Sequence, residues 1–255
     1  MEDLDRPREI PGAADAILRT LEALGFEWDG SVMYQHRRDS VYEQALADLR
    51  AQGLAYPCGC SRKEIVKAGL SAADGGWRYP GVCRAGLRDG KRARLWRMRV
   101  DDTPVCIEDG VQGRYCQNLE SEVGDFVLKR ADGLFAYQLA VVVDDAEQGV
   151  THVVRGSDLL ASMPRQRVLQ RALGLPEPIY AHVPVATDGN GKKWSKRTHA
   201  PVVDATPGAL VEALRFLGQT PEPALARAGY ATIRQWALEY WDAARIPRRM
   251  GIPWS

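Results

Sequence analysis

The sequence predicts an α/β protein that carries a cysteine-rich insertion and ends in helices. Segments with apolar residues at helical spacing alternate with short apolar strands, which is typical of a parallel sheet covered by helices. All five cysteines lie between positions 58 and 116, in a stretch that interrupts this alternation. The last 50 residues contain two further helical patterns and no sustained strand pattern.

Each element is bounded by turn or cap residues. Gly25, Gly53 and Gly174 follow the apolar patterns of three helices, where glycine commonly ends a helix. The pair Asp132-Gly133 marks a turn between two strands. The expected elements are helices over 14–24 and 41–52, a hairpin of 94–100 with 105–107, strands over 125–130, 135–143, 150–155 and 183–186, and helices over 158–173, 207–217 and 233–244. The chain divides accordingly into α/β residues 1–53, an inserted module 54–123, α/β residues 124–205 and a helical segment 206–255.

The composition is that of an ordinary globular protein. Of 255 residues, 34 are Lys or Arg and 33 are Asp or Glu, so no global basic field indicates nucleic-acid binding, although a local RNA site stays open. No apolar run approaches the roughly 18 residues of a membrane span, and the first residues lack the basic start and apolar core of a signal peptide. An odd number of clustered cysteines favours metal or free thiols over disulfides. We therefore expect a cytoplasmic monomer that does not contact a membrane.

The first cysteines have a spacing that suits a metal ion. Cys58 and Cys60 flank a glycine that lets both thiolates face one ion, and Cys83 returns a third thiol. Structural zinc takes four tetrahedral ligands, so a fourth donor is needed. The alternative is a group of buried free thiols. The candidates for the fourth ligand are Tyr79, Cys106, Cys116 or a water molecule.

A basic loop follows the strand at 183–186. Residues 188–191 (Asp-Gly-Asn-Gly) tolerate left-handed backbone angles, and four Lys or Arg residues then occur between positions 192 and 197. A glycine-hinged loop with several cations can neutralise a polyphosphate and stabilise charge during phosphoryl or nucleotidyl transfer. The alternative is a basic hairpin tip without a ligand.

Two residues near strand ends are candidates for substrate contacts. Tyr137 lies in an apolar segment where its hydroxyl needs a partner, and Arg155 ends a strand, where ligands of open α/β sheets bind. The planar fork of Arg155 suits a carboxylate. The alternative for Arg155 is a surface ion pair with Asp158 or Asp144. The pair Asp144-Asp145 could hold magnesium, but paired acids after a strand are more often turn formers.

Four segments, in this order and spacing, resemble the catalytic domain of class I glutamyl-tRNA synthetases. They are residues 2–8 (EDLDRPR), 140–145 (AVVVDD), 149–156 (GVTHVVRG) and 193–196 (KWSK). The cysteine module and the short helical end resemble more closely a shortened paralogous family, the glutamyl-Q tRNA(Asp) synthetases, which lack the anticodon-binding domain. The resemblance implies a Rossmann-like fold with a small zinc-binding insertion.

The resemblance also implies roles for individual residues. Residues 193–197 correspond to the KMSKS loop of the family, with Trp194 and Arg197 departing from its consensus, and Lys196 would contact the phosphates of ATP. Glu2 would hold the ammonium group of glutamate, while Tyr137 and Arg155 would make its other contacts. The implied catalytic residues are Lys193, Ser195 and Lys196. The implied zinc ligands are Cys58, Cys60, Tyr79 and Cys83, with a longer spacer before Tyr79 than the family suggests.

In the family, a first strand, an Arg-x-Ala-Pro-Ser segment and a HIGH-type helix start precede the segment that here begins at Glu2. We therefore expect some 40 further residues upstream, omitted by assignment of an internal start or by a real truncation. The truncated form, expressed alone, is expected to be much less active.

The function that the resemblance implies is activation of glutamate with ATP and Mg²⁺, followed by transfer of glutamate to queuosine at the wobble position of tRNA(Asp). A first alternative is a truncated glutamyl-tRNA synthetase that charges the tRNA 3′ end. A second is a degenerate zinc-containing protein that binds RNA or another partner without catalysis.

Overall fold

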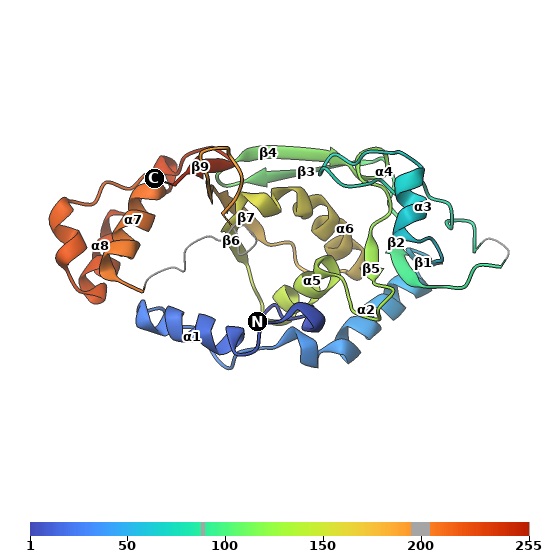
Figure 1. Cartoon of the computed structure of the whole chain (residues 1–255), viewed down its shortest axis with the longest axis horizontal. Coiled ribbons are helices and arrows are strands. Elements are labelled where there is room, and N and C mark those ends of the chain that lie inside the picture. Colours follow the sequence, from blue (N-terminus) through green and yellow to red (C-terminus); the bar gives the residue numbers. More distant parts are fainter. Residues whose placement is uncertain (88–89, 195–204, 255) are drawn as a thin grey trace.

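The computed structural model describes residues 1–87, 90–194 and 205–254. A sheet lies in the middle of an elongated molecule, with the C-terminal helices at one end and the strands at 55–58 and 95–98 at the other (Figure 1). The helices are α1 (Ala13–Ala23), α2 (Asp39–Ala51), α3 (Arg62–Lys67), α4 (Leu119–Glu122), α5 (Tyr137–Glu147), α6 (Met163–Leu173), α7 (Pro207–Phe216) and α8 (Tyr230–Tyr240). The strands are β1 (Ala55–Cys58), β2 (Leu95–Met98), β3 (Pro104–Asp109), β4 (Gly113–Asn118), β5 (Val127–Lys129), β6 (His152–Gly156), β7 (Ile179–Val183), β8 (Val185–Thr187) and β9 (Gly251–Pro253).

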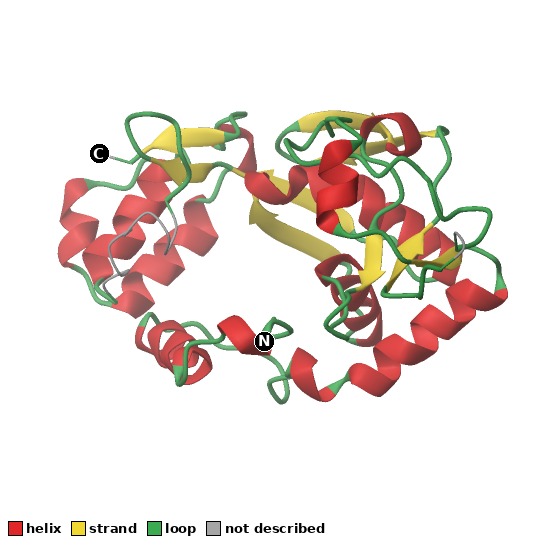
Figure 2. Cartoon of the chain, turned by 45° about the vertical axis from the view of Figure 1, so that its right-hand side comes forward, coloured by secondary structure: helices red, strands yellow, loops and turns green. Residues whose placement is uncertain are grey.

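The central sheet has the strand order β4-β3-β7-β6 and is mixed. Figure 2 shows the strands in yellow and the helices in red. Strands β3 and β6 both run parallel to β7, while β4 pairs antiparallel with β3. Helices α2, α5 and α6 pack on one another, and α6 also packs on β3. Their shared core contains Leu46, Leu139, Met163 and Leu169, all fully buried. The predicted α/β class is confirmed, with one antiparallel edge strand added to the parallel part.

The second sheet, β1-β2-β5, is antiparallel, and its strand β1 ends at Cys58, next to Cys60 and Cys83. The predicted hairpin of 94–100 with 105–107 is wrong, because β2 pairs with β1 and β5, whereas β3 pairs with β4. The connection between β2 and β3 contains no glycine or asparagine to form a tight turn. Instead, the Asp102 carboxylate accepts hydrogen bonds from the backbone and hydroxyl of Ser121, so the connection is tied to α4.

The predicted strand over 135–143 is a helix, α5. The three consecutive valines in this segment favour a strand by local propensity. Packing determines otherwise: the helix buries Leu139, Ala140 and Val142 against α2 and α6, and it brings Asp144 within hydrogen-bond reach of α2. Tertiary contacts therefore override the local preference.

The other predicted helices form near the expected positions. Residues 157–173 begin as a 3₁₀ turn (Ser157–Ser162) that continues into α6, and Gly174 ends α6 with a positive φ of 63°. Helix α3 begins with a capping box in which Ser61 and Glu64 each accept the other's backbone N–H. Among the helices that the structure describes, none has the length and apolar character required to span a membrane.

Candidate active site and metal centre

Arg155 lies near the carboxyl end of β6, where ligands of α/β sheets bind. Its guanidinium donates three hydrogen bonds to protein side chains. Nε donates to His182 Nε2 at 2.9 Å, and Nη2 donates to Gln166 Oε1 at 2.8 Å. Nη1 donates a longer bond of 3.4 Å to the Tyr137 hydroxyl. The predicted neighbours Arg155 and Tyr137 are therefore brought together, and the plane of the guanidinium is fixed by three elements.

Acidic groups surround this arginine. Tyr137 is the first residue of α5, and Asp145 lies two turns further along the same helix. Burial raises the pKa of Asp145 to about 6, with Arg155 opposing the shift and Glu2 adding to it. Desolvation by the surrounding protein raises the pKa of Glu2, although the residue is exposed. The chain's amino group and Arg155 both oppose that shift. Glu2, Tyr137, Asp145 and Arg155 thus form one electrostatic cluster that can hold a ligand with both a carboxylate and an ammonium group.

The alternative partners suggested for Arg155 are engaged elsewhere. Asp144 is buried and accepts hydrogen bonds from Gln35 at 2.9 Å, Arg38 at 2.8 Å and Tyr42 at 2.8 Å. Asp158 forms an ion pair with Lys193. Within the described residues, Arg155 makes no ion pair with either acid. The pair Asp144-Asp145 was expected to form a turn; both residues lie inside α5, and Asp144 links that helix to α2.

The start of the basic loop is an ordered hairpin. The Asp188 carboxylate accepts the backbone N–H groups of Asn190 and Lys192, each at 2.9 Å, and Gly191 has a positive φ of 76°. Beyond this turn, Trp194 N–H donates to Ala186 at 2.9 Å. The ion pair between Lys193 and Asp158 ties the loop to the segment that follows Arg155. Three residues predicted for this loop, Ser195, Lys196 and Arg197, lie outside the described residues.

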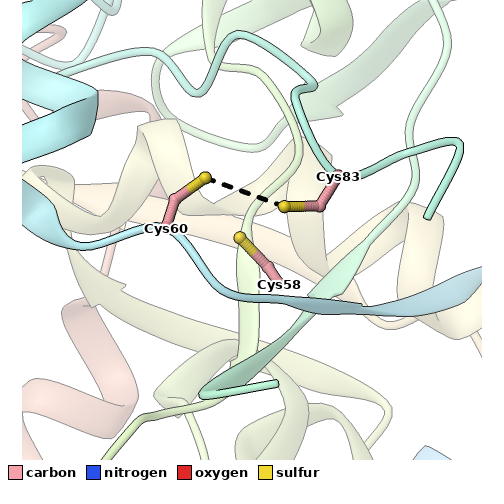
Figure 3. A group of neighbouring side chains, drawn as sticks. All are labelled: Cys58, Cys60 and Cys83. Atoms are coloured by element: carbon pink, nitrogen blue, oxygen red, sulfur yellow. Dashed lines mark hydrogen bonds between the residues drawn. The ribbon is translucent and has the colours of Figure 1, made fainter. Parts of the chain in front are cut away.

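The sulfur atoms of Cys58, Cys60 and Cys83 point toward one another (Figure 3) and lie within 4.8 Å of one another. The Cys60 and Cys83 sulfurs are 3.7 Å apart. Tetrahedral zinc ligands at roughly 2.0–2.3 Å from the ion lie roughly 3.3–3.8 Å from each other, so this spacing fits zinc. Gly59 is required here because a Cβ atom at this position would lie 2.8 Å from the carbonyl oxygen of Arg92.

Tyr79 is the candidate that the structure places at the fourth position. Its hydroxyl oxygen is 3.4 Å from Cys58 Sγ and 3.7 Å from Cys60 Sγ, and it accepts the Cys83 N–H at 2.8 Å. Burial raises the pKa of the Cys60 thiol to about 11 and also raises the pKa of Tyr79. Burial acts in the same direction on Cys83, but hydrogen bonds from Tyr79 and the Gly59 backbone outweigh it and lower the pKa of that thiol. A bound cation would lower the pKa of all three thiols and so favour their thiolate forms.

The remaining cysteines form a disulfide. Cys106 and Cys116 are opposite one another in the β3–β4 pair and are bonded. The expectation of metal ligands or free thiols is therefore wrong for this pair, and neither residue can be the fourth ligand. The cause is the register of the hairpin, which could not be read from a separation of 10 residues.

Sequence reasoning missed three polar residues of the arginine site, Asp109, Gln166 and His182, and it considered Asp145 only as a magnesium ligand or turn former. His182 is fully buried in β7, and Asp109 ends β3. A histidine in a strand segment rich in apolar residues is a weak signal by itself. The strand register, which pairs His182 directly with Arg155, supplies the missing information.

The chain is similar in sequence to known proteins over nearly its whole length. Residues 1–234 match the family model of tRNA synthetases class I (E and Q), catalytic domain. A protein of Dechloromonas aromatica named glutamyl-Q tRNA(Asp) synthetase is 58% identical over 252 residues, covering 98% of this chain and 84% of that protein. A protein of Geobacter sulfurreducens with the same name is 54% identical, covering 97% and 82%.

The fold matches a solved structure as well. The crystal structure of glutamate-tRNA synthetase from Elizabethkingia anophelis superposes with a TM-score of 0.76 at 23% identity, and the match covers 100% of this chain and 60% of that one. The chain thus spans somewhat less than two thirds of that larger protein. By sequence over nearly its whole length, the chain belongs to the class I tRNA synthetases of the E and Q type and, within them, to the glutamyl-Q tRNA(Asp) synthetase family.

Proposed function

We propose that the protein activates glutamate with ATP and Mg²⁺ to glutamyl-adenylate, and that it transfers glutamate to queuosine at the wobble position of tRNA(Asp). The observation that carries the proposal is the cluster of Arg155, Tyr137 and Glu2. One N–H on each terminal nitrogen of Arg155 has no acceptor among the described residues. These two groups can bind the side-chain carboxylate of glutamate, and Glu2 can bind its ammonium group.

Selection of glutamate over glutamine follows from the charge of Arg155. A carboxylate replaces the water lost by the guanidinium with charge-assisted hydrogen bonds, whereas a neutral amide replaces it poorly. Lys193 and Lys196 would neutralise the triphosphate of ATP, and Ser195 would contribute a hydroxyl in the same loop. The ion pair of Lys193 with Asp158 supports this arrangement, because it holds the start of the loop beside the strand end that carries Arg155.

We propose further that one structural zinc ion, held by Cys58, Cys60, Cys83 and Tyr79, stabilises residues 54–85 and strand β2. Strands β3 and β4, which lie within the predicted module of 54–123, pair in the central sheet instead. The donor set and the sulfur spacing support this assignment. When bound, the ion would join segments that otherwise share a small core. No chemical step depends on it.

The decisive assay is glutamate-dependent ATP–pyrophosphate exchange without tRNA, followed by transfer of labelled glutamate to tRNA(Asp) with and without queuosine. We expect exchange, and transfer only to the queuosine-containing tRNA. Lys196→Ala should slow exchange by about 10²-fold, as loss of a cation in the transition state implies, while Lys63→Ala on the exposed face of α3 should not. Labelling of the tRNA 3′ end would favour the alternative of a glutamyl-tRNA synthetase. Absence of exchange would favour a non-catalytic protein.

A further inference from the structure

A buried acid–histidine pair lies directly behind Arg155. Asp109, His182 and Arg155 come from β3, β7 and β6, three adjacent strands of the central sheet. Arg155 and His182 are partners in the parallel register, and both the Asp109 and His182 side chains are completely inaccessible to solvent. Neither residue has a part in the function proposed above, although buried charges are rarely kept without a partner or a role.

The hydrogen bonds define which nitrogen of His182 carries the proton. Arg155 Nε can only donate, and it lies 2.9 Å from His182 Nε2, so Nε2 must be the unprotonated acceptor. Nδ1 therefore carries the hydrogen and donates to Asp109 Oδ2 at 2.6 Å. Asp109 Oδ1 accepts the backbone N–H groups of His182 at 3.0 Å, Val111 at 3.1 Å and Gln112 at 2.9 Å.

This network keeps Asp109 charged and His182 neutral. Burial acts to raise the pKa of Asp109, but the bonds from His182 and from three backbone amides outweigh it and lower that pKa. Burial lowers the pKa of His182, and the neighbouring Arg155 adds to this effect, against the opposing influence of Asp109. The imidazole is thus a neutral spacer between an anion and a cation.

We propose that Asp109 and His182 are positioning residues that hold Arg155 for a carboxylate ligand without neutralising it. The inference rests on the proposed function, because it concerns how the arginine of that site binds glutamate. If an acid bonded Arg155 directly, it would occupy the donors and compete with the substrate carboxylate. The neutral imidazole instead fixes Nε and leaves the positive charge, with one N–H on each terminal nitrogen, for the ligand.

The substitution Asp109→Asn tests the proposal through the tautomer. The asparagine oxygen can keep accepting the backbone N–H groups, but its NH₂ group would face His182 Nδ1. The ring would then carry its hydrogen on Nε2, which would point at the N–H of Arg155 Nε. An equivalent exchange of Asp for Asn produces the wrong histidine tautomer in serine proteases.

We expect the KM for glutamate in pyrophosphate exchange to rise about tenfold or more in Asp109→Asn, with kcat changed less than about threefold, because ground-state binding is affected. Glu108→Gln, a change of the same charge at the exposed neighbouring position, is the matched control and should leave both constants unchanged. His182→Gln offers a neutral oxygen acceptor without tautomers. In that background Asp109→Asn should have little further effect, which a double-mutant cycle measures as coupling.

A measurement on the unaltered protein does not depend on whether the variants fold. Nitrogen NMR of the four histidines should include, near pH 7, a neutral ring protonated on Nδ1 whose signal disappears in His182→Gln. His36, whose ring also lies between an acid and an arginine, should keep its own signal in that variant. A charged ring or an Nε2-protonated ring at His182 would overturn the proposal. An equal glutamate KM in Asp109→Asn and the active parent would overturn it too. A parent without glutamate-dependent exchange would instead contradict the proposed function.

Discussion

The arginine site and the cysteine site satisfy their buried polar groups in different ways. Around Arg155, each donor or acceptor of the Asp109–His182 pair meets a partner from the protein at 2.6–3.1 Å. In the cysteine site, three buried thiols and a tyrosine hydroxyl meet mainly one another, at 3.4–3.7 Å between heavy atoms. Thiols are weak hydrogen-bond donors. The polar groups of the first site are therefore satisfied by the protein itself, whereas those of the second are left with weak partners that a metal ion could replace.

This difference predicts different consequences of substitution. A preformed site loses affinity for its substrate when one group is removed, while the surrounding fold remains. A site organised by an ion loses the ion, and the local structure is lost with it. Three changes test this distinction.

The largest expected effect comes from Arg155→Ala. Removing two charge-assisted hydrogen bonds to the substrate should lower kcat/KM for glutamate by about 10²- to 10³-fold. The fold should be kept, with a melting temperature lowered only by the loss of the bonds to His182 and Gln166. Exchange kinetics over a range of glutamate concentrations measure the effect. Arg155→Lys keeps the charge without the planar fork, so its kcat/KM for glutamate should lie between those of the parent and of Arg155→Ala. Glutamate dependence equal to that of the parent in the alanine variant would remove Arg155 from the substrate site.

At the cysteine site, a substitution should affect the metal content and the local fold rather than substrate binding. Cys58→Ser should release zinc and unfold residues 54–85 before the central sheet, because ligand binding there is coupled to folding. Elemental analysis should give about one zinc per chain in the parent and far less in the variant, and hydrogen exchange should locate the loss of structure.

The double substitution of Cys106 and Cys116 by serine is the matched control for this change. It removes two sulfurs of the same chain segment without touching the cluster, so the zinc content should stay at the parental value. A parent that folds normally with no zinc would identify the three cysteines as buried thiols.

The sequence predicted the helices best where caps and apolar spacing agreed. The glycine that ends α6 required only local information. The sequence predicts a strand at the position of α5, because consecutive valines favour strands. Only the packing of this segment against α2 and α6 makes it a helix. Likewise, the pairing of β3 with β4 depends on contacts that no local pattern encodes.

The candidate sites show the same division. Cys58, Cys60 and Cys83 were predicted as a group from spacing, and the structure brings them together. Their own sequence segments indicate only that Tyr137 and Arg155 could contact a substrate. The family resemblance is what predicts that both contact glutamate. His182 and Asp109 could not be found in this way, because their relation to Arg155 arises from the order of three strands that are distant in sequence.

The smallest expected effect concerns the pH dependence of stability at the arginine site. The pKa of Asp145 is raised to about 6 from an ordinary value of 3.8, so between about pH 4 and 6 the folded protein binds more protons at this group than the unfolded chain does. The contribution of Asp145 to the free energy of unfolding must therefore fall as the pH rises through this interval, and it must be constant above about pH 6.

Asp145→Asn removes this penalty. Relative to the parent, the variant should gain thermal stability between pH 4.5 and 7, by about 2–4 °C, a small shift because the side chain is only partly buried. Thermal melts of both proteins across this range measure the difference. A pH-independent difference would mean that Asp145 titrates normally. The acidic side of the arginine site would then be solvated rather than buried.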